Sequence, residues 1–175
     1  LPRVKRSLDR AIQLTNVPAA WNLLNGVSNA GAGVKIGVID TGIESTHPAF
    51  QDPTLKIPAG YPICAGSDCF YTNNKVIVAR SYVKYLAAGF VVSPAIQVDP
   101  ATDRPDDISA RDRDGHGTAV AMAAAGVTTP GPTATITGVA PKAYLGSYKV
   151  FGSPGLNDFS TAFAVNRALE DAFAD

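Results

Sequence analysis

The chain has 175 residues, of which 46% are hydrophobic and 17% are charged. This length fits one domain or part of one, with enough apolar material for a core and too little charge for a disordered chain. Fifteen basic and fifteen acidic residues give a formal net charge of zero, so neither nucleic acid nor an anionic membrane is expected as a partner, and no apolar run approaches a membrane span.

Residues 1–33 are interpreted as a lead-in segment. Ser7 is suited to cap a short helix from Leu8 to Leu14. A second short helix is expected from Val17 to Leu24, because a proline near its start and a glycine after its end favour those boundaries. Trp21, inside this helix, is expected to anchor it by packing.

The segment from Val34 to Ile43 is predicted to form a strand buried on both faces, as strands of parallel sheets are. Its apolar residues are mostly β-branched, and few polar residues interrupt them. The segment carries a carboxylate, Asp40, near its end. A charge is costly to bury unless it is paired, and the carboxyl ends of parallel strands are where α/β proteins place their chemistry. Asp40 is therefore either a buried capping residue or a catalytic one.

The next region carries a histidine and the two cysteines. His47 precedes a proline and is interpreted as a structural or surface residue. Residues 51–74 contain three prolines and are expected to form a surface excursion outside the sheet. Cys64 and Cys69 can close a disulfide in an oxidising compartment. The alternative is half of a metal site with His47 and His116, but these histidines are distant in sequence and no second cysteine pair exists, so the disulfide is favoured.

A further strand is predicted from Asn74 to Ala79, whereas residues 82–98 give no clear pattern. Residues 99–114 are interpreted as a solvated polar loop. A cation site is the alternative, because hard cations take clustered oxygen ligands, although the spacing is not that of an EF-hand. The acidic residues of this loop are Asp99, Asp103, Asp106, Asp107, Asp112 and Asp114.

His116 lies between two glycines at the start of an alanine-rich segment. Alanine favours a helix, and Gly126 is a plausible end to it. Glycines next to a histidine allow another backbone to approach closely. A structural role and a functional role for His116 both remain open on this pattern alone.

The last third of the chain predicts one more strand and one more helix. The strand is expected from Ala143 to Phe151, and a helix capped by Asp158 is expected to run to Phe173 with an apolar stripe facing the core. Alternating strands and helices predict an α/β fold with a parallel sheet.

Three short segments then share an order that resembles the subtilisin-like serine protease family. They are Val38–Gly42, Gly115–Thr118 and Gly138–Lys142. The chain is most similar in style to the larger secreted members that carry a protease-associated insert, and the resemblance starts near Val17. It implies a three-layer parallel sheet, incomplete because the chain stops before the second half of the fold. Residues 34–175 would then be the N-terminal portion of a single catalytic domain.

The resemblance also implies a reaction and residues for it. Asp40 and His116 would be two members of an Asp-His-Ser triad that hydrolyses peptide bonds. Phe151, Gly152 and Phe159 would border the substrate, with core packing as the alternative for the two phenylalanines. The family's nucleophile motif, Gly-Thr-Ser, does not occur in these 175 residues. The chain alone is therefore expected to be inactive, and its expected partners are a protein or peptide substrate and the remainder of its own catalytic domain. The candidate serines all lack the context of that motif, and they are Ser81, Ser93, Ser109, Ser147, Ser153 and Ser160.

No cofactor is expected for such an enzyme, and no metal-binding residue is assigned. Some family members bind calcium through an aspartate two residues after the position of His47, where this chain has Ala49, so a site of that type has no support. The family and the cysteine pair together imply a secreted protein.

Two other functions fit part of the sequence. Asp40, Thr41 and Gly42 also spell the signature of aspartic proteases, in which two carboxylates activate water, but that family needs a second such tripeptide or a symmetric dimer. A degenerate subtilisin-like domain kept for binding is the non-enzymatic alternative. In either subtilisin-like case an incomplete sheet is expected to expose an apolar edge and to associate.

Overall fold

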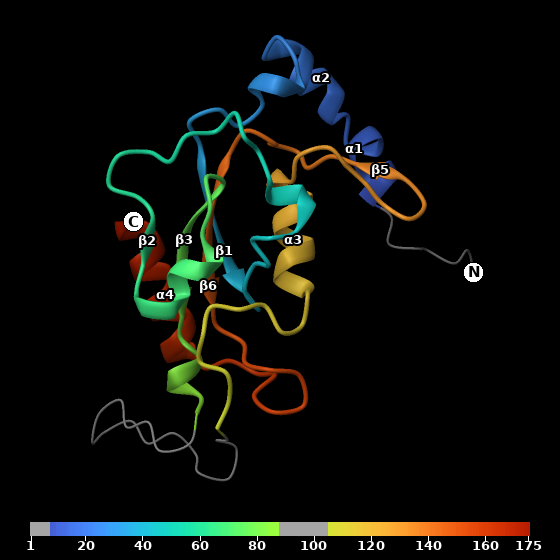
Figure 1. Ribbon diagram of the computed structural model, residues 1–175. Coiled ribbons are helices and arrows are strands. Elements are labelled where there is room, and N and C mark those ends of the chain that lie inside the picture. Colours follow the sequence, from blue (N-terminus) through green and yellow to red (C-terminus); the bar gives the residue numbers. More distant parts are fainter. Residues whose placement is uncertain (1–7, 88–104) are drawn as a thin grey trace, which may run out of the picture.

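A computed structural model describes residues 8–87 and 105–175. The centre is a parallel four-stranded sheet in the order β1-β6-β3-β2. Helix α3 covers one face and helix α4 the other, which makes three layers (Figure 1). This confirms the predicted α/β architecture. The bounds are β1 Lys35–Asp40, β2 Ile63–Cys64, β3 Val76–Ser81, β6 Tyr144–Lys149, α3 His116–Ala125 and α4 Ala162–Ala174.

Each face of the sheet has its own hydrophobic cluster. On one side the alanines and Met122 of α3 pack against Val38 and Leu145. On the other side Ala164 of α4 packs against Ile77 and Tyr148. Small residues on both helices bring them close to the sheet, and this closeness sets how near the start of α3 lies to the strand ends.

The N-terminal segment forms two short helices, α1 Leu8–Leu14 and α2 Val17–Leu23. Helix α2 ends one residue earlier than expected, because the chain takes up left-handed backbone conformations at Asn25 and Gly26. The indole Nε1 of Trp21 donates a hydrogen bond to the carbonyl of Val139 at 2.8 Å. A small antiparallel hairpin follows α3, with strands β4 Thr129–Pro130 and β5 Thr135–Ile136.

Two predictions about the sheet were wrong. Strand β1 is not buried on both faces, since Val38 is its only buried residue and Lys35 and Gly37 are exposed. It lies at the edge of the sheet and pairs only with β6 within the described part of the chain. The excursion of residues 51–74 also contributes to the sheet, because β2 pairs in parallel with β3 at Ile63 and Cys64.

The start of α4 differs from the prediction as well. Thr161, not Asp158, caps the helix, and its side chain accepts a hydrogen bond from the amide of Ala164. Thr161 has the extended backbone that a capping residue needs, and its oxygen reaches an amide that would otherwise lack a partner. Asp158 therefore lies in the loop before the helix.

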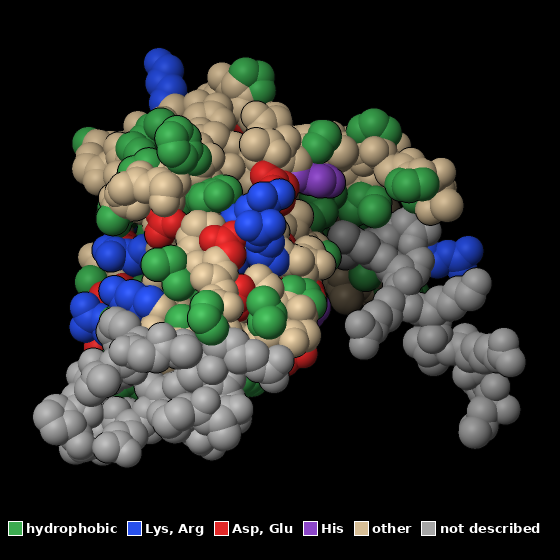
Figure 2. All heavy atoms as spheres, turned by 60° about the horizontal axis from the view of Figure 1, so that its bottom comes forward, with side chains coloured by type: hydrophobic (Ala, Val, Ile, Leu, Met, Phe, Trp, Pro, Cys, Tyr) green, Lys and Arg blue, Asp and Glu red, His purple; other side chains and the backbone are tan. Residues whose placement is uncertain are grey.

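No helix in the described ranges is long and apolar enough to cross a membrane. On the face shown in Figure 2, basic and acidic side chains lie beside one another, and neither sign dominates. This mixture agrees with the zero net charge.

Candidate active site

The structure brings Asp40 and His116 together at the carboxyl end of the sheet. The ring atom Nδ1 of His116 lies 2.8 Å from Oδ1 and 3.0 Å from Oδ2 of Asp40. An ionised carboxylate only accepts hydrogen bonds, so a carboxylate in this contact would favour the ring form that carries its proton on Nδ1. The Asp40 side chain is 13% exposed and the His116 side chain 61% exposed. The acid is thus enclosed, while the imidazole faces the solvent.

Two separate elements place these side chains. Asp40 is the last residue of β1, and His116 is the first residue of α3. The backbone of Asp40 is fixed by parallel pairing with Lys149 and by a hydrogen bond from the amide of Val150 to its carbonyl. The amide of Thr41 donates to Oδ1 of Asp40 at 2.7 Å, which orients the carboxylate toward the helix.

A close approach of two backbones holds the start of α3 against the end of β1. A Cβ atom added at Gly117 would lie 2.2 Å from the carbonyl oxygen of Gly42. Gly42 itself has a φ of +113°, and a Cβ there would meet the carbonyl of Ala110 at 2.8 Å. Only glycine fits either position. The close contact of the two backbones therefore explains why the chain has glycine at both Gly42 and Gly117.

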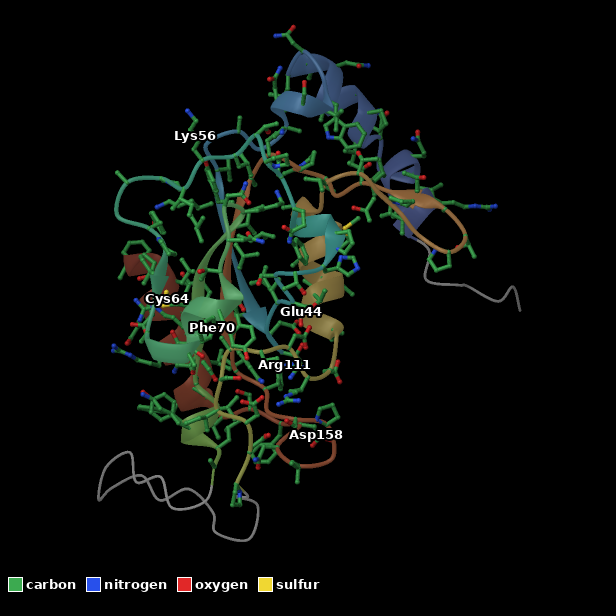
Figure 3. All side chains as sticks on the ribbon, viewed as in Figure 1. Glu44, Lys56, Cys64, Phe70, Arg111 and Asp158 are labelled. Carbon is green, nitrogen blue, oxygen red and sulfur yellow. A yellow bond between two sulfur atoms is a disulfide. The ribbon has the colours of Figure 1, made fainter. Side chains whose placement is uncertain are left out.

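A cleft of about 430 Å³ opens beside the pair. Phe151 and Gly152 line it, whereas Phe159 is not part of its lining. Pro154 adds apolar surface, and Asp114 and Asp158 add carboxylates. No serine lines this cleft among the described residues. In Figure 3, Glu44, Arg111 and Asp158 lie toward the end of the molecule where β1 ends, and Lys56 lies toward the opposite end.

The acidic loop is more ordered than a solvated loop, in the part the structure describes. Asp106 accepts a hydrogen bond from the amide of Ser153 at 2.7 Å. Asp107 forms an ion pair with Arg113 at 2.6 Å. Burial alone would raise the pKa of Asp107, but hydrogen bonds from Ser109 and the Arg113 guanidinium lower it to about 2. Asp99 and Asp103 lie outside the described residues.

Asp112 is one of the six aspartates of this loop, and no sequence signal separates it from the others. It lies between the end of β1 and the start of α3, where both segments donate hydrogen bonds to it. Burial would raise the pKa of its carboxyl, but hydrogen bonds from Thr118, Gly115 and Asp114 outweigh burial and hold the pKa below its ordinary value. Among the described residues, no group of three or more acidic, histidine or cysteine side chains could hold a metal ion.

Cys64 and Cys69 are joined by a disulfide, with 5.1 Å between their Cα atoms. Within this small loop, Asp68 accepts a hydrogen bond from the amide of Ala110 at 2.8 Å. The disulfide loop therefore supports the acidic loop that runs toward α3.

His47 lies in a local turn, where its Nδ1 accepts a hydrogen bond from the amide of Ala49.

The six candidate serines of the sequence lie outside the lining of the cleft beside the pair or outside the described residues. Ser147 is fully buried in β6, and Ser81 is the last residue of β3. Ser93 lies outside the described residues. Ser109, Ser153 and Ser160 lie in loops before α3 and α4.

Comparison with known proteins identifies a family for the chain. A sequence model of the subtilase family matches residues 31–174. The chain is 37% identical over 173 residues to subtilisin-like protease SBT3.4 of Arabidopsis thaliana, which covers 90% of this chain and 22% of the relative. It is 33% identical over 168 residues to SBT1.9 of the same plant, with 91% and 22% covered.

The chain spans about a fifth of the length of these relatives. Asp40 faces an imidazole, whereas an aspartic protease would place a second carboxylate there. The family match covers most of the chain, from before β1 to the end of α4. On these grounds the chain belongs to the subtilase family of subtilisin-like proteases.

Proposed function

We propose that this chain supplies the acid and the base of a subtilisin-type serine endopeptidase, Asp40 and His116. One observation carries the proposal: the Nδ1 atom of His116 lies within hydrogen-bond reach of both carboxylate oxygens of Asp40, at the carboxyl end of a parallel sheet. In such a pair the carboxylate selects one tautomer of the imidazole and stabilises its protonated form.

The chemistry follows from that tautomer. With the proton held on Nδ1, the other ring nitrogen, Nε2, is the basic one. Nε2 takes the proton of a serine hydroxyl as the hydroxyl attacks the peptide carbonyl, and then returns it to the leaving amine. Asp40 stays ionised throughout and orients the ring. The exposed imidazole is accessible to a substrate.

The substrate is a protein or peptide, which is what the family implies. The cleft beside His116 has an apolar wall at Phe151 and a side-chain-free stretch at Gly152. A residue without a side chain lets an extended peptide approach the backbone closely. Phe159 is left out of this proposal, because it is not part of the cleft lining.

The nucleophile is proposed to come from outside these 175 residues. The chain lacks a Gly-Thr-Ser tripeptide and matches about a fifth of each relative. We propose that residues 34–175 are the first part of a single catalytic domain, and that β1 pairs through its second edge with a further segment of it. The 175 residues alone are then inactive, because an acid and a base without a nucleophile cannot form an acyl-enzyme.

The disulfide favours a secreted protein, since such bonds persist in oxidising compartments. Neither a metal nor a cofactor is part of the proposed mechanism.

The test compares the 175-residue chain with a longer chain that includes the coding sequence after Asp175. Hydrolysis of a quenched fluorescent peptide pool and labelling by a serine-directed phosphonate are measured on both. Both signals are expected from the longer chain alone. Asp40→Asn in the longer chain is expected to lower kcat about 10⁴-fold, because the imidazole loses its tautomer. Asp107→Asn, an acid of the neighbouring loop, is the matched control and should leave kcat unchanged.

Two results would contradict the proposal. Hydrolysis that survives Asp40→Asn would remove the carboxylate from the mechanism. A longer chain that binds peptide but is neither labelled nor hydrolytic would favour the degenerate binding domain.

A further inference from the structure

The proposed acid and base come from segments that are 76 positions apart in sequence, and one side chain joins those segments. Catalytic groups must be held to within about 0.5 Å of their productive positions by supporting side chains. Asp112 lies between the two segments, and each of its carboxylate oxygens contacts the start of α3.

The first oxygen, Oδ1, connects α3 to the end of β1. It accepts a hydrogen bond from the hydroxyl of Thr41 at 2.9 Å and from the amide of Gly115 at 2.8 Å. Thr41 follows Asp40 directly, and Gly115 precedes His116 directly. The Thr41 hydroxyl in turn accepts a hydrogen bond from the amide of Gly117 at 2.8 Å. The chain neighbours of both proposed catalytic residues are thus tied to one oxygen atom.

The second oxygen, Oδ2, holds the first turn of α3. It accepts hydrogen bonds from the amide of Thr118, at 3.1 Å, and from the Thr118 hydroxyl. That hydroxyl accepts a hydrogen bond from the amide of Glu44 at 3.0 Å, which returns the network to the segment after β1. A carboxylate suits this place because both of its oxygens face donors. An asparagine would turn its own amide toward one of them.

We infer that Asp112 is a positioning residue, which acts through Thr41, Gly115 and Thr118 to hold the His116 ring against Asp40. The inference rests on the proposed function, because it assigns Asp112 a role in aligning that pair. It predicts that loss of the Asp112 carboxylate changes the state of the His116 ring in a domain that stays folded.

The test is the tautomer of His116 in the 175-residue chain, measured by long-range ¹H–¹⁵N correlation spectra at a pH where the ring is neutral. His47→Asn assigns the two histidines. The wild-type ring is expected to carry its proton on Nδ1. In Asp112→Asn the ratio of the Nδ1–H to the Nε2–H form is expected to fall about tenfold or more, as for the loss of one hydrogen bond to a charged acceptor.

Asp107→Asn is the matched control, because Asp107 belongs to the same loop and pairs with Arg113 rather than with the segments around the pair. Its tautomer ratio should equal that of the wild type. Thr41→Val gives a second route, since it removes the link between β1 and Asp112 while preserving side-chain shape. It should lower the ratio in the same direction, and it decides the matter if Asp112→Asn does not fold.

A folded Asp112→Asn or Thr41→Val chain with the wild-type ratio would overturn the inference, as would an equal change in Asp107→Asn. A wild-type ring that does not prefer Nδ1–H would overturn the Asp40–His116 pair itself, and the positioning role with it. The wild-type spectrum alone therefore separates failure of the proposed function from failure of the role of Asp112.

Discussion

Gly117 and Gly42 decide how near α3 comes to the end of β1. We predict that Gly117→Ala destabilises the fold by about 3 kcal/mol, because the added methyl group must displace the carbonyl of Gly42, 2.2 Å away. Gly37→Ala is the matched control, since a Cβ there meets Tyr148 at an ordinary contact distance of 3.4 Å. Urea unfolding measures both. Equal unfolding midpoints for the two variants would show that the close approach of the two backbones does not affect stability.

The residues around the pair differ in how well the sequence predicts them. Asp40 and His116 stand out because Asp40 lies two residues before a glycine and His116 lies between two, and because each ends or begins a regular element. These signals lie within a few residues. Asp112 does not stand out, because it is one of six similar aspartates and its partner Thr41 lies 71 positions away. A local pattern carries no information about such a partner.

Lys75, just before β3, is fully buried, and its ammonium group donates to the carbonyls of Pro141 and Ala143 at 2.7 and 2.8 Å. Burial lowers the pKa of Lys75 from 10.5 to about 8. Between these two values the unfolded chain binds the proton and the folded chain does not, so stability attributable to this group rises with pH across that window. The difference between these two pKa values corresponds to about 3 kcal/mol across the whole window.

Lys75→Met removes this titration. We measure the free energy of unfolding in urea from pH 8 to 10. As the pH increases, the value for the wild type is expected to increase more than the value for the variant. The difference in slope is the measured quantity, because the variant also loses two hydrogen bonds and its absolute stability is not comparable. Parallel curves would show that Lys75 titrates alike in both states.

The loop closed by Cys64 and Cys69 supports the acidic loop through Asp68 and Ala110. Replacing both cysteines with alanine is expected to destabilise the fold by about 2 kcal/mol, as the unfolded chain regains freedom. The amide of Ala110 should also exchange faster with deuterium, because Asp68 is no longer held beneath it. In Asp68→Asn, with the disulfide intact, faster exchange at Ala110 should come with a smaller loss of stability. Unchanged exchange in both variants would show that the two loops are not coupled.

The regular elements show where periodicity is informative and where it is not. The alanine-rich α3 lies where its composition indicates. Helix α4 also forms as predicted and buries Ala164 and Ala168, but the prediction that its whole apolar stripe faces the core was wrong, because Leu169 and Phe173 are exposed. The first residue of α4 differs, because Asp158 and Thr161 are both good caps and only the backbone conformation at Thr161 decides between them. The two-residue β2 has no periodicity at all. It is a strand because β3 offers it an open edge.

Helix α4 carries apolar side chains that the described part of the chain does not cover. Phe173 is 95% exposed and Leu169 is 53% exposed, and they lie one turn apart on the same helix face. We predict that the 175-residue chain self-associates through this face. Phe173→Glu should raise the dissociation constant about tenfold or more, since burying one phenylalanine side chain is worth about 1.5–3 kcal/mol.

Sedimentation velocity over a range of concentrations measures this association. Phe70→Glu is the matched control, because Phe70 is 83% exposed but belongs to the short helical segment beside the disulfide. It should leave the dissociation constant unchanged. A wild-type chain that stays monomeric at all concentrations would contradict the prediction.

For the molecule as a whole, the layered α/β architecture follows from the alternation of strands and helices, but the position of β1 at the sheet edge does not. Its β-branched residues read as those of a central strand, although Val38 is the only one buried. The same residue pattern fits a strand that is paired on both edges and a strand that is paired on one edge. The pattern of β1 is suited to pairing on both edges, and the described residues pair with only one of them.

Asp40 ends this one-sided strand, so the acid lies on the boundary along which any additional strand would join. A strand that joins there would form backbone hydrogen bonds with β1 and would thereby help to fix the direction in which the chain leaves the sheet at Asp40. If that strand paired out of register several residues before Asp40, the orientation of the Asp40 carboxylate would change. Pairing in register would add to the hold that β6 already has on the backbone of Asp40.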